Sequence, residues 1–192
     1  VGSGDFYTFI VINPDIVSTN AALLAKHSGA DDYLLRVAST NKIQQYIGST
    51  SSGVVTAGTT ISSGTTYIVA GYRKTSVSYV RVDGTADGYA VNALSLSNSN
   101  TFHVAGQASA GTAANYDGKI AEIVMGGGSI EDKEIQKVEG YLAERYALTS
   151  LPAAHPYKQH PPTESLEISG TSGDIEGGLT QSISSELTTV RI

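Results

Sequence analysis

Short apolar segments, separated by glycine, serine and asparagine, recur along the chain from residue 5 to residue 125. The segment DFYTFIVI (5–12) is almost entirely β-branched or aromatic and is stopped by an Asn-Pro pair, which predicts a buried strand. Segments 22–27 and 33–38 flank the turn-rich SGADD and predict a hairpin. Further strands are predicted at segments 42–48, 53–58, 65–72, 101–106 and 118–125. The pattern predicts a chain built from many short strands.

A second hairpin is predicted at residues 76–91. Its first half, SVSYVRV, alternates between two sets of side chains, as expected of a strand with two different faces. Asp83-Gly84 follows directly, and this dipeptide tolerates the positive φ angles of a two-residue hairpin turn. We therefore expect the chain to reverse at Asp83 and Gly84.

One helix is predicted, after the glycines at 126–128. Ser129 is placed to cap its first turn, and the acidic pair at 131–132 favours the positive end of the helix dipole. Ile135, Val138 and Leu142 form an apolar stripe that is expected to face a sheet. Together these elements predict an all-β fold: an antiparallel β-sandwich of the jelly-roll type with one C-terminal amphipathic helix.

Composition narrows the classes of function. The 192 residues carry a formal net charge of -6 and no run of Lys or Arg, which argues against nucleic acid as a partner. Cysteine is absent, so neither disulfides nor thiolate chemistry is expected. No apolar run is long enough for membrane insertion. The chain begins at Val1, and we interpret it as a processed product or as a segment of a larger protein.

Cofactor and metal motifs are sparse. GSGDFY lacks the spacing of a dinucleotide fingerprint, and no glycine-rich loop ends in Gly-Lys-Ser/Thr, so no cofactor is expected. Calcium is the metal that the sequence leaves open. Asp31, Asp32 and Asp117 are the candidate ligands, with Asn115 nearby, although solvated turn carboxylates are the more frequent reading of such a pattern.

Acidic, histidine and tyrosine side chains give the remaining candidates. The acidic residues at 131–134 lie at the start of the predicted helix, away from a sheet face, so no catalytic residue is predicted. His155 and His160 lie in a proline-rich loop without a fixed common face, and we expect surface packing for both. Most tyrosines lie in predicted strands, whereas Tyr116 in the loop AANYDGK is expected to be more exposed. Asn115 and Tyr116 are the candidate ligand-binding residues.

Four segments, in this order, resemble the concanavalin A-like lectin/glucanase superfamily and, within it, the laminin G-like domains. They are FYTFIVINPD, LLAKHSGADDYLLRV, YIVAGYRKTSVSYVRVDG and YDGKIAEIVMGGGSIEDKEIQKVEGYLAERYAL. The ending, from IAEIVM to LPAAHPYKQHPP, resembles the ends of such domains in bacteriophage tail and other virion proteins, and in some bacterial surface proteins. Tyr146 stands where the family often carries Trp. The catalytic carboxylate motif of the glucanase branch is absent, so the resemblance implies binding rather than hydrolysis.

The resemblance implies one domain over residues 1–162. The change of composition after the proline pair at 161–162 indicates a β-rich tail, a linker or the start of a further module at 163–192. It implies a non-catalytic module of a virion surface or fibre, with host-surface glycans or other virion proteins as partners. One alternative is a structural module that decorates a particle through protein contacts, in which residues 163–192 could add a strand to a neighbour. A bacterial surface adhesin is another, and a glucanase is not favoured. Homo-oligomer formation and the identity of the ligand stay open.

Overall fold

The computed structural model describes residues 4–26, 33–48, 53–96, 99–106 and 115–162. Within these ranges the chain forms ten strands and one helix: β1 (Phe6–Pro14), β2 (Ala21–Lys26), β3 (Tyr33–Val37), β4 (Lys42–Ile47), β5 (Val54–Thr60), β6 (Tyr67–Lys74), β7 (Val77–Val82), β8 (Thr85–Val91), β9 (His103–Val104), β10 (Gly118–Gly127) and α1 (Asp132–Arg145). The predicted strands are confirmed, although the strand predicted at 101–106 is only two residues long.

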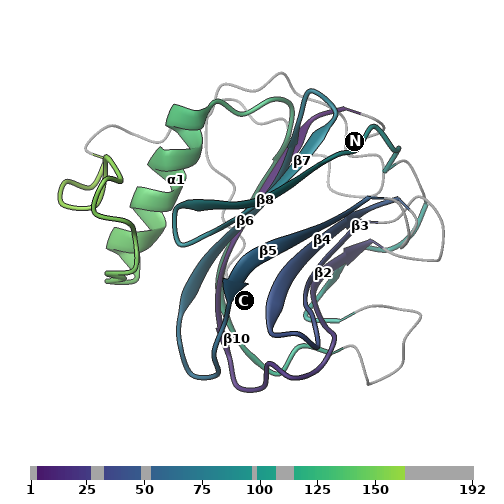
Figure 1. The fold of residues 1–192 in the computed structure, drawn as a ribbon, viewed down its shortest axis with the longest axis horizontal. Helices are drawn as coiled ribbons and strands as arrows, with labels where there is room; N and C mark the ends of the chain where they lie inside the picture. Colours follow the sequence, from purple (N-terminus) through teal and green to yellow (C-terminus); the bar gives the residue numbers. More distant parts are fainter. Residues whose placement is uncertain (1–3, 27–32, 49–52, 97–98, 107–114, 163–192) are drawn as a thin grey trace.

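The described strands make two five-stranded sheets that pack face to face. The first sheet has the order β10-β1-β6-β7-β8 and the second has the order β5-β4-β3-β2-β9, with antiparallel pairing throughout. Figure 1 shows α1 lying against the outer side of the first sheet, away from the second. The fold is therefore the predicted jelly-roll sandwich with one C-terminal helix.

Strand β1 is apolar on both faces because both faces are covered. Phe6, Ile10 and Ile12 point into the core between the two sheets, whereas Phe9 and Val11 point outward into a second apolar cluster with α1. All five side chains are at most 5% exposed. A strand covered on both sides has no need for polar positions, which explains its nearly continuous apolar run.

Helix α1 packs through the predicted stripe but begins later than expected. Ile135, Val138 and Leu142 are at most 1% exposed and contact the outer face of the first sheet. Ser129 is not the cap: the N-cap is Glu131, and no side chain caps the helix there. Strand β10 continues through Gly127, the chain bends at Gly128 with a φ of 100°, and Ile130 is buried under the helix, so the helix begins only after Glu131.

The β7–β8 hairpin turns where the sequence predicts. Asp83 and Gly84 both have positive φ, 48° and 76°, as a two-residue turn of this kind requires. The turn is packed rather than solvated, because a Cβ added at Gly84 would lie 2.9 Å from a side-chain carbon of Leu151 and 3.0 Å from Cδ2 of His155. The carboxylate of Asp83 also accepts the backbone N–H of Ile68, with an N···O distance of 2.8 Å.

The segment that follows α1 returns along the helix. Leu151 is buried, and Tyr146 and Leu148 are partly buried, all in the cluster that contains the helix stripe. No helix in the described ranges is long and apolar enough to cross a membrane. Residues 163–192, and with them the predicted tail strands, lie outside the described residues, so the domain boundary at 162 stays a prediction.

Candidate ligand-binding face

The outer face of the second sheet points away from α1 (Figure 1). Paired residues of neighbouring strands share a face, so the strand register defines two rows of side chains across it. The first row, ordered from β5 toward the far edge, is Thr56, Gln44, Arg36, Ala22 and Asn115. The second row is Val54, Tyr46, Leu34, Ala25 and His103. We call these ten residues the β2–β5 face.

A hydrogen-bonded network fixes Arg36 at the centre of the β2–β5 face. Its Nε and Nη2 both donate to Oε1 of Gln44, at 3.0 and 2.8 Å, and Nη2 also donates to the hydroxyl of Tyr46. The guanidinium carbon lies 4.5 Å from the centroid of the Tyr46 ring, in a cation–π arrangement. Gln44 is held in turn, because its amide donates to Thr56 at 3.0 Å. The guanidinium is thus preorganised at small further cost in side-chain entropy.

Arg36 keeps its charge available for a ligand. Among the described residues it forms no ion pair, whereas Arg81 pairs with Glu139 and Arg145 pairs with Glu122. Its partners, an amide and a phenol, are neutral. Arg36 and Gln44 are half-buried and can be reached from solvent, whereas Ala22, Ala25, Leu34 and Tyr46 of the same face are buried. The two rows contain no aspartate or glutamate.

Sequence reasoning found only one end of this face. Asn115 is exposed and forms a bridge to Ala22, at the end of the row that contains Arg36. Arg36 and Gln44 were not singled out, although they are polar residues at outward positions of apolar strands. That alternation is visible in YLLRV and KIQQYI, but the strand pairing that brings the two side chains together is not.

The expectation that Tyr116 is exposed is wrong. Its side chain is 8% exposed and belongs to the core between the sheets. The backbone N–H of Tyr116 bonds the carbonyl of Ala105, at 3.1 Å, and the neighbouring Asn115 faces solvent, so the ring of Tyr116 points inward. Burial, followed by the negative charges of Asp15 and Asp117, raises the pKa of Tyr116.

Of the three candidate calcium ligands, only Asp117 lies among the described residues. Asp117 is exposed, and its backbone carbonyl accepts the N–H of Asp15 at 3.0 Å. Asp31 and Asp32 lie outside the described residues. In the described part of the chain, no group of three or more His, Asp or Glu side chains is arranged to hold a metal ion. Calcium binding stays a prediction.

A buried cluster of charged side chains joins α1, the β7–β8 hairpin and the C-terminal segment. Arg81 donates to both carboxylate oxygens of Glu139, at 2.7 and 3.0 Å, and Nε2 of His155 lies 3.2 Å from the same carboxylate. The expectation of surface packing is wrong for His155, which is 7% exposed. Nδ1 of His155 accepts the N–H of Tyr157 at 3.3 Å, so a neutral ring with its proton on Nε2 satisfies both contacts. His160 is exposed, as expected.

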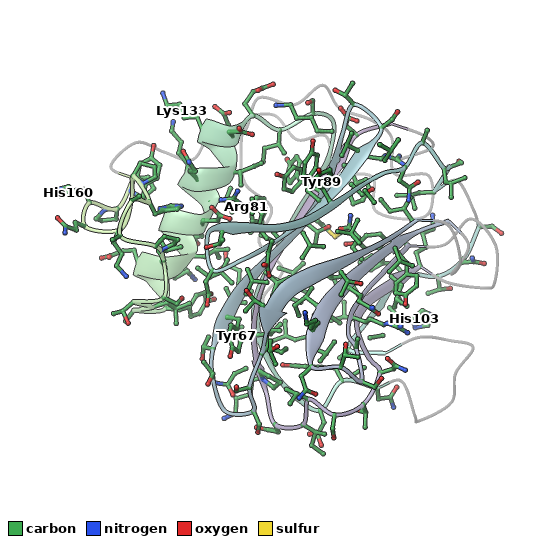
Figure 2. All side chains as sticks on the ribbon, in the orientation of Figure 1. Tyr67, Arg81, Tyr89, His103, Lys133 and His160 are labelled. Atoms are coloured by element: carbon green, nitrogen blue, oxygen red, sulfur yellow. The ribbon has the colours of Figure 1, made fainter. Side chains whose placement is uncertain are left out.

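A row of tyrosines crosses the outer face of the first sheet. The register aligns Tyr7, Tyr72, Tyr79 and Tyr89 on β1, β6, β7 and β8. The rings of Tyr72 and Tyr79 are stacked, with centroids 4.9 Å apart, and Tyr89 follows at 6.3 Å. Exposure rises along the row from 5% at Tyr72 to 76% at Tyr89, which Figure 2 labels. Burial is the main reason that the pKa of Tyr72 is raised to about 12.

Sequence comparison identifies the family. A profile described as the concanavalin A-like lectin/glucanases superfamily matches residues 9–136, more than half of the chain. The chain therefore belongs to this superfamily, as the resemblance implied. A comparison with curated protein sequences finds no significant match.

Solved structures share the fold at low sequence identity. A candidate carbohydrate-binding protein from Bacteroides ovatus matches with a TM-score of 0.57 and 14% identity, over 69% of this chain and 40% of that protein. A heptameric SAP-like pentraxin from Limulus polyphemus gives 0.56 and 12%, over 70% and 69% of the two chains. The CBM40 of a Ruminococcus gnavus IT-sialidase, bound to α2,3-sialyllactose, gives 0.53 and 12%, over 64% and 75%. This chain thus spans about two fifths of the Bacteroides protein. The fold is that of the concanavalin A-like lectin/glucanases superfamily.

Proposed function

We propose that this protein is a glycan-binding module and that the β2–β5 face is its binding surface. The observation that carries the proposal is the fixed guanidinium of Arg36, which is held by Gln44 and Tyr46 and has no carboxylate partner among the described residues. A guanidinium in one fixed orientation can donate paired hydrogen bonds to adjacent sugar hydroxyls or to a sugar carboxylate. Structural neighbours from carbohydrate-binding proteins support this choice.

The proposed binding is non-catalytic. Glycoside hydrolysis generally needs two carboxyl groups on either side of the scissile bond. The two rows of the β2–β5 face carry amide, hydroxyl, imidazole and guanidinium groups but no carboxylate. Those groups can hold a sugar and orient it, but they do not form an acid–base pair of that kind.

A glycan array with the 192-residue chain tests this function. We expect one class of glycan to bind the wild type and to bind Arg36→Gln at least tenfold more weakly, because a charged hydrogen-bond donor is lost. Lys119→Gln removes an exposed positive charge from β10, in the other sheet, and serves as the matched control. Absence of binding to any glycan would overturn the proposal, and hydrolysis of a bound glycan would overturn its non-catalytic part.

The proposed setting is the surface or a fibre of a virion, where the module would contact glycans of a bacterial host. The support is the resemblance of the segment from IAEIVM to LPAAHPYKQHPP to the ends of such domains in virion proteins. A bacterial surface adhesin is the alternative setting. Competition by the purified protein in a phage adsorption assay separates the two, because an adhesin would not block adsorption.

A structural role through protein contacts is the second candidate function, and one surface favours it. Val77, Tyr79, Tyr89 and Val91 share the outer face of β7 and β8, with Val91 82% and Tyr89 76% exposed. Paired exposed apolar residues of this size often mark protein interfaces. Sedimentation velocity tests self-association through this patch, which Tyr89→Ser with Val91→Ser should abolish. A wild type that stays monomeric at all concentrations would contradict it.

A further inference from the structure

Four polar side-chain atoms are buried between the two sheets and have no hydrogen-bond partner among the described residues. They are Oγ1 of Thr8, the hydroxyl oxygen of Tyr33, Oε1 of Gln45 and Oγ of Ser78. All four residues are at most 5% exposed. A buried polar atom without a partner costs free energy, and in native proteins nearly all such atoms are bonded to protein or to ordered water. This part of the core therefore calls for a further partner.

Thr8 and Gly71 form a low point in the inner surface of the first sheet. They are register partners on β1 and β6, and each is the smallest inward-facing residue of its strand. Gln45 reaches into this point from β4, because a Cβ added at Gly71 would lie 2.0 Å from Oε1 of Gln45. Its Nε2 donates to the carbonyl of Tyr72, with an N···O distance of 3.4 Å. Ser78 pairs with a different residue of β6 and lies further along the sheet.

The hydroxyl of Tyr33 reaches the same place from β3. Tyr33 is two residues from Leu35, the register partner of Gln45, so both polar side chains come from the inner face of the second sheet. Burial raises the pKa of Tyr33, and the neighbouring hydroxyl of Thr8 partly offsets this rise. The two hydroxyls are thus close, although they do not have the geometry of a direct hydrogen bond. Tyr33 keeps its proton and can donate it, whereas Oε1 of Gln45 can only accept.

We propose that Thr8, Tyr33 and Gln45 bind one ordered water molecule between the two sheets. The hydroxyl of Tyr33 donates to the water, and the water donates to Oε1 of Gln45 and to Oγ1 of Thr8. Three partners are the usual number for a buried water molecule. The water links the sheets from inside, and it anchors β4 next to Gln44, which bonds Arg36 on the outer face. The site does not depend on glycan binding.

A crystal structure of the 192-residue chain, at a resolution that shows ordered water, tests the site directly. We expect one water molecule within hydrogen-bond distance of Oγ1 of Thr8, the hydroxyl of Tyr33 and Oε1 of Gln45. Direct hydrogen bonds among the three side chains would overturn the proposal. Well-defined side-chain density with no water between them would overturn it as well.

Urea denaturation of conservative variants tests the same site in solution. Thr8→Val keeps the shape of the side chain and removes its hydroxyl. The bound water then loses a partner, so the midpoint should fall by about 0.5 M. Without a bound water, the same change removes an unpaired buried hydroxyl, and the midpoint should stay the same or rise. A midpoint at or above that of the wild type would therefore contradict the site.

Tyr33→Phe and a matched control complete this series. Tyr33→Phe should also lower the midpoint, and the double variant with Thr8→Val should lose less than the sum of the two single losses, because both hydroxyls bind one water. Strictly additive losses would show that they do not share a ligand. Thr60→Val makes the same change at an exposed position of β5 and should leave the midpoint unchanged.

Discussion

Single substitutions in this protein are expected to have large effects on stability where charged side chains are buried among apolar groups. Glu139 is fully buried and is bound by both Arg81 and His155. Such a pair adds little net stability when intact, because its desolvation cost offsets the attraction, but breaking it leaves one charge without compensation. The cluster therefore locks three parts of the fold in one arrangement.

Replacement of Glu139 tests this lock. Glu139→Ala should lower the free energy of unfolding by about 3–5 kcal/mol, because Arg81 is left largely buried without its carboxylate. Glu144→Ala changes an exposed glutamate of the same helix and should cost well under about 1 kcal/mol. Urea denaturation of both variants measures the difference. Similar losses in the free energy of unfolding for the two variants would contradict a structural role for the Glu139 cluster.

The pH dependence of stability has a predicted contribution from Asp83. Burial raises its pKa, partly offset by hydrogen bonds from the N–H of Ile68 and the hydroxyl of Ser150. A carboxyl whose pKa is raised by folding binds its proton more tightly in the folded state. Its contribution therefore favours the folded state below the ordinary pKa and is lost as the pH rises through the raised pKa.

Asp83→Asn removes this effect and keeps both the acceptor for Ile68 and the tolerance for positive φ. The stability of the variant relative to the wild type should thus be greater at pH 7 than at pH 3. Urea denaturation of both proteins at the two pH values measures it. The prediction would be contradicted if the free energy of unfolding of the variant minus that of the wild type were smaller at pH 7 than at pH 3.

The helix, strands and turns that depend on local sequence pattern are the features that the sequence predicts. Strands, the Asp83-Gly84 turn and the helix stripe follow from alternation, turn chemistry and 3.6-residue spacing. The helix start was misplaced because a buried Ile130 overrides a local capping signal. The β2–β5 face and the row of tyrosines were missed for a different reason. Each exists only through the register in which neighbouring strands pair, and a single sequence does not reveal that register.

Gly64 and Gly84 have nearly the same φ but different surroundings. Replacing each with alanine therefore distinguishes the cost of backbone strain from the cost of a steric clash at the tip of the β7–β8 hairpin. Gly84 and Gly64 have φ of 76° and 75°, but only Gly84 has neighbours within 4 Å of an added Cβ. Gly64→Ala should cost about 1 kcal/mol from the positive φ alone. Gly84→Ala should cost distinctly more, because Leu151 and His155 must shift. Equal losses in chemical denaturation would show that the hairpin tip is not tightly packed.

For the whole molecule, the layered fold separates two surfaces. Helix α1 and the segment after it cover one side of the sandwich, and the second sheet presents its outer face on the other (Figure 1). In the part of the chain that the structure describes, both apolar clusters that hold the layers together, between the sheets and beneath α1, are built from residues before 152. We therefore expect residues 1–162 to fold independently of residues 163–192.

Truncation after Pro162 tests the domain boundary. The shortened chain should unfold cooperatively, with a midpoint within a few degrees of that of the 192-residue chain, because none of the described residues of either cluster is removed. Circular dichroism during heating measures this. A shortened chain without a cooperative transition would show that residues 163–192 belong to the folded domain.

The most direct test of the central claim is calorimetric titration of the best array glycan into the wild type, Arg36→Gln and Lys119→Gln. The account predicts that Arg36→Gln binds at least tenfold more weakly, while Lys119→Gln binds as the wild type does. Because Arg36 is held in place by Gln44, Gln44→Ala should also weaken binding, by a smaller factor. Unchanged affinity in Arg36→Gln would contradict the assignment of the β2–β5 face as the glycan-binding surface.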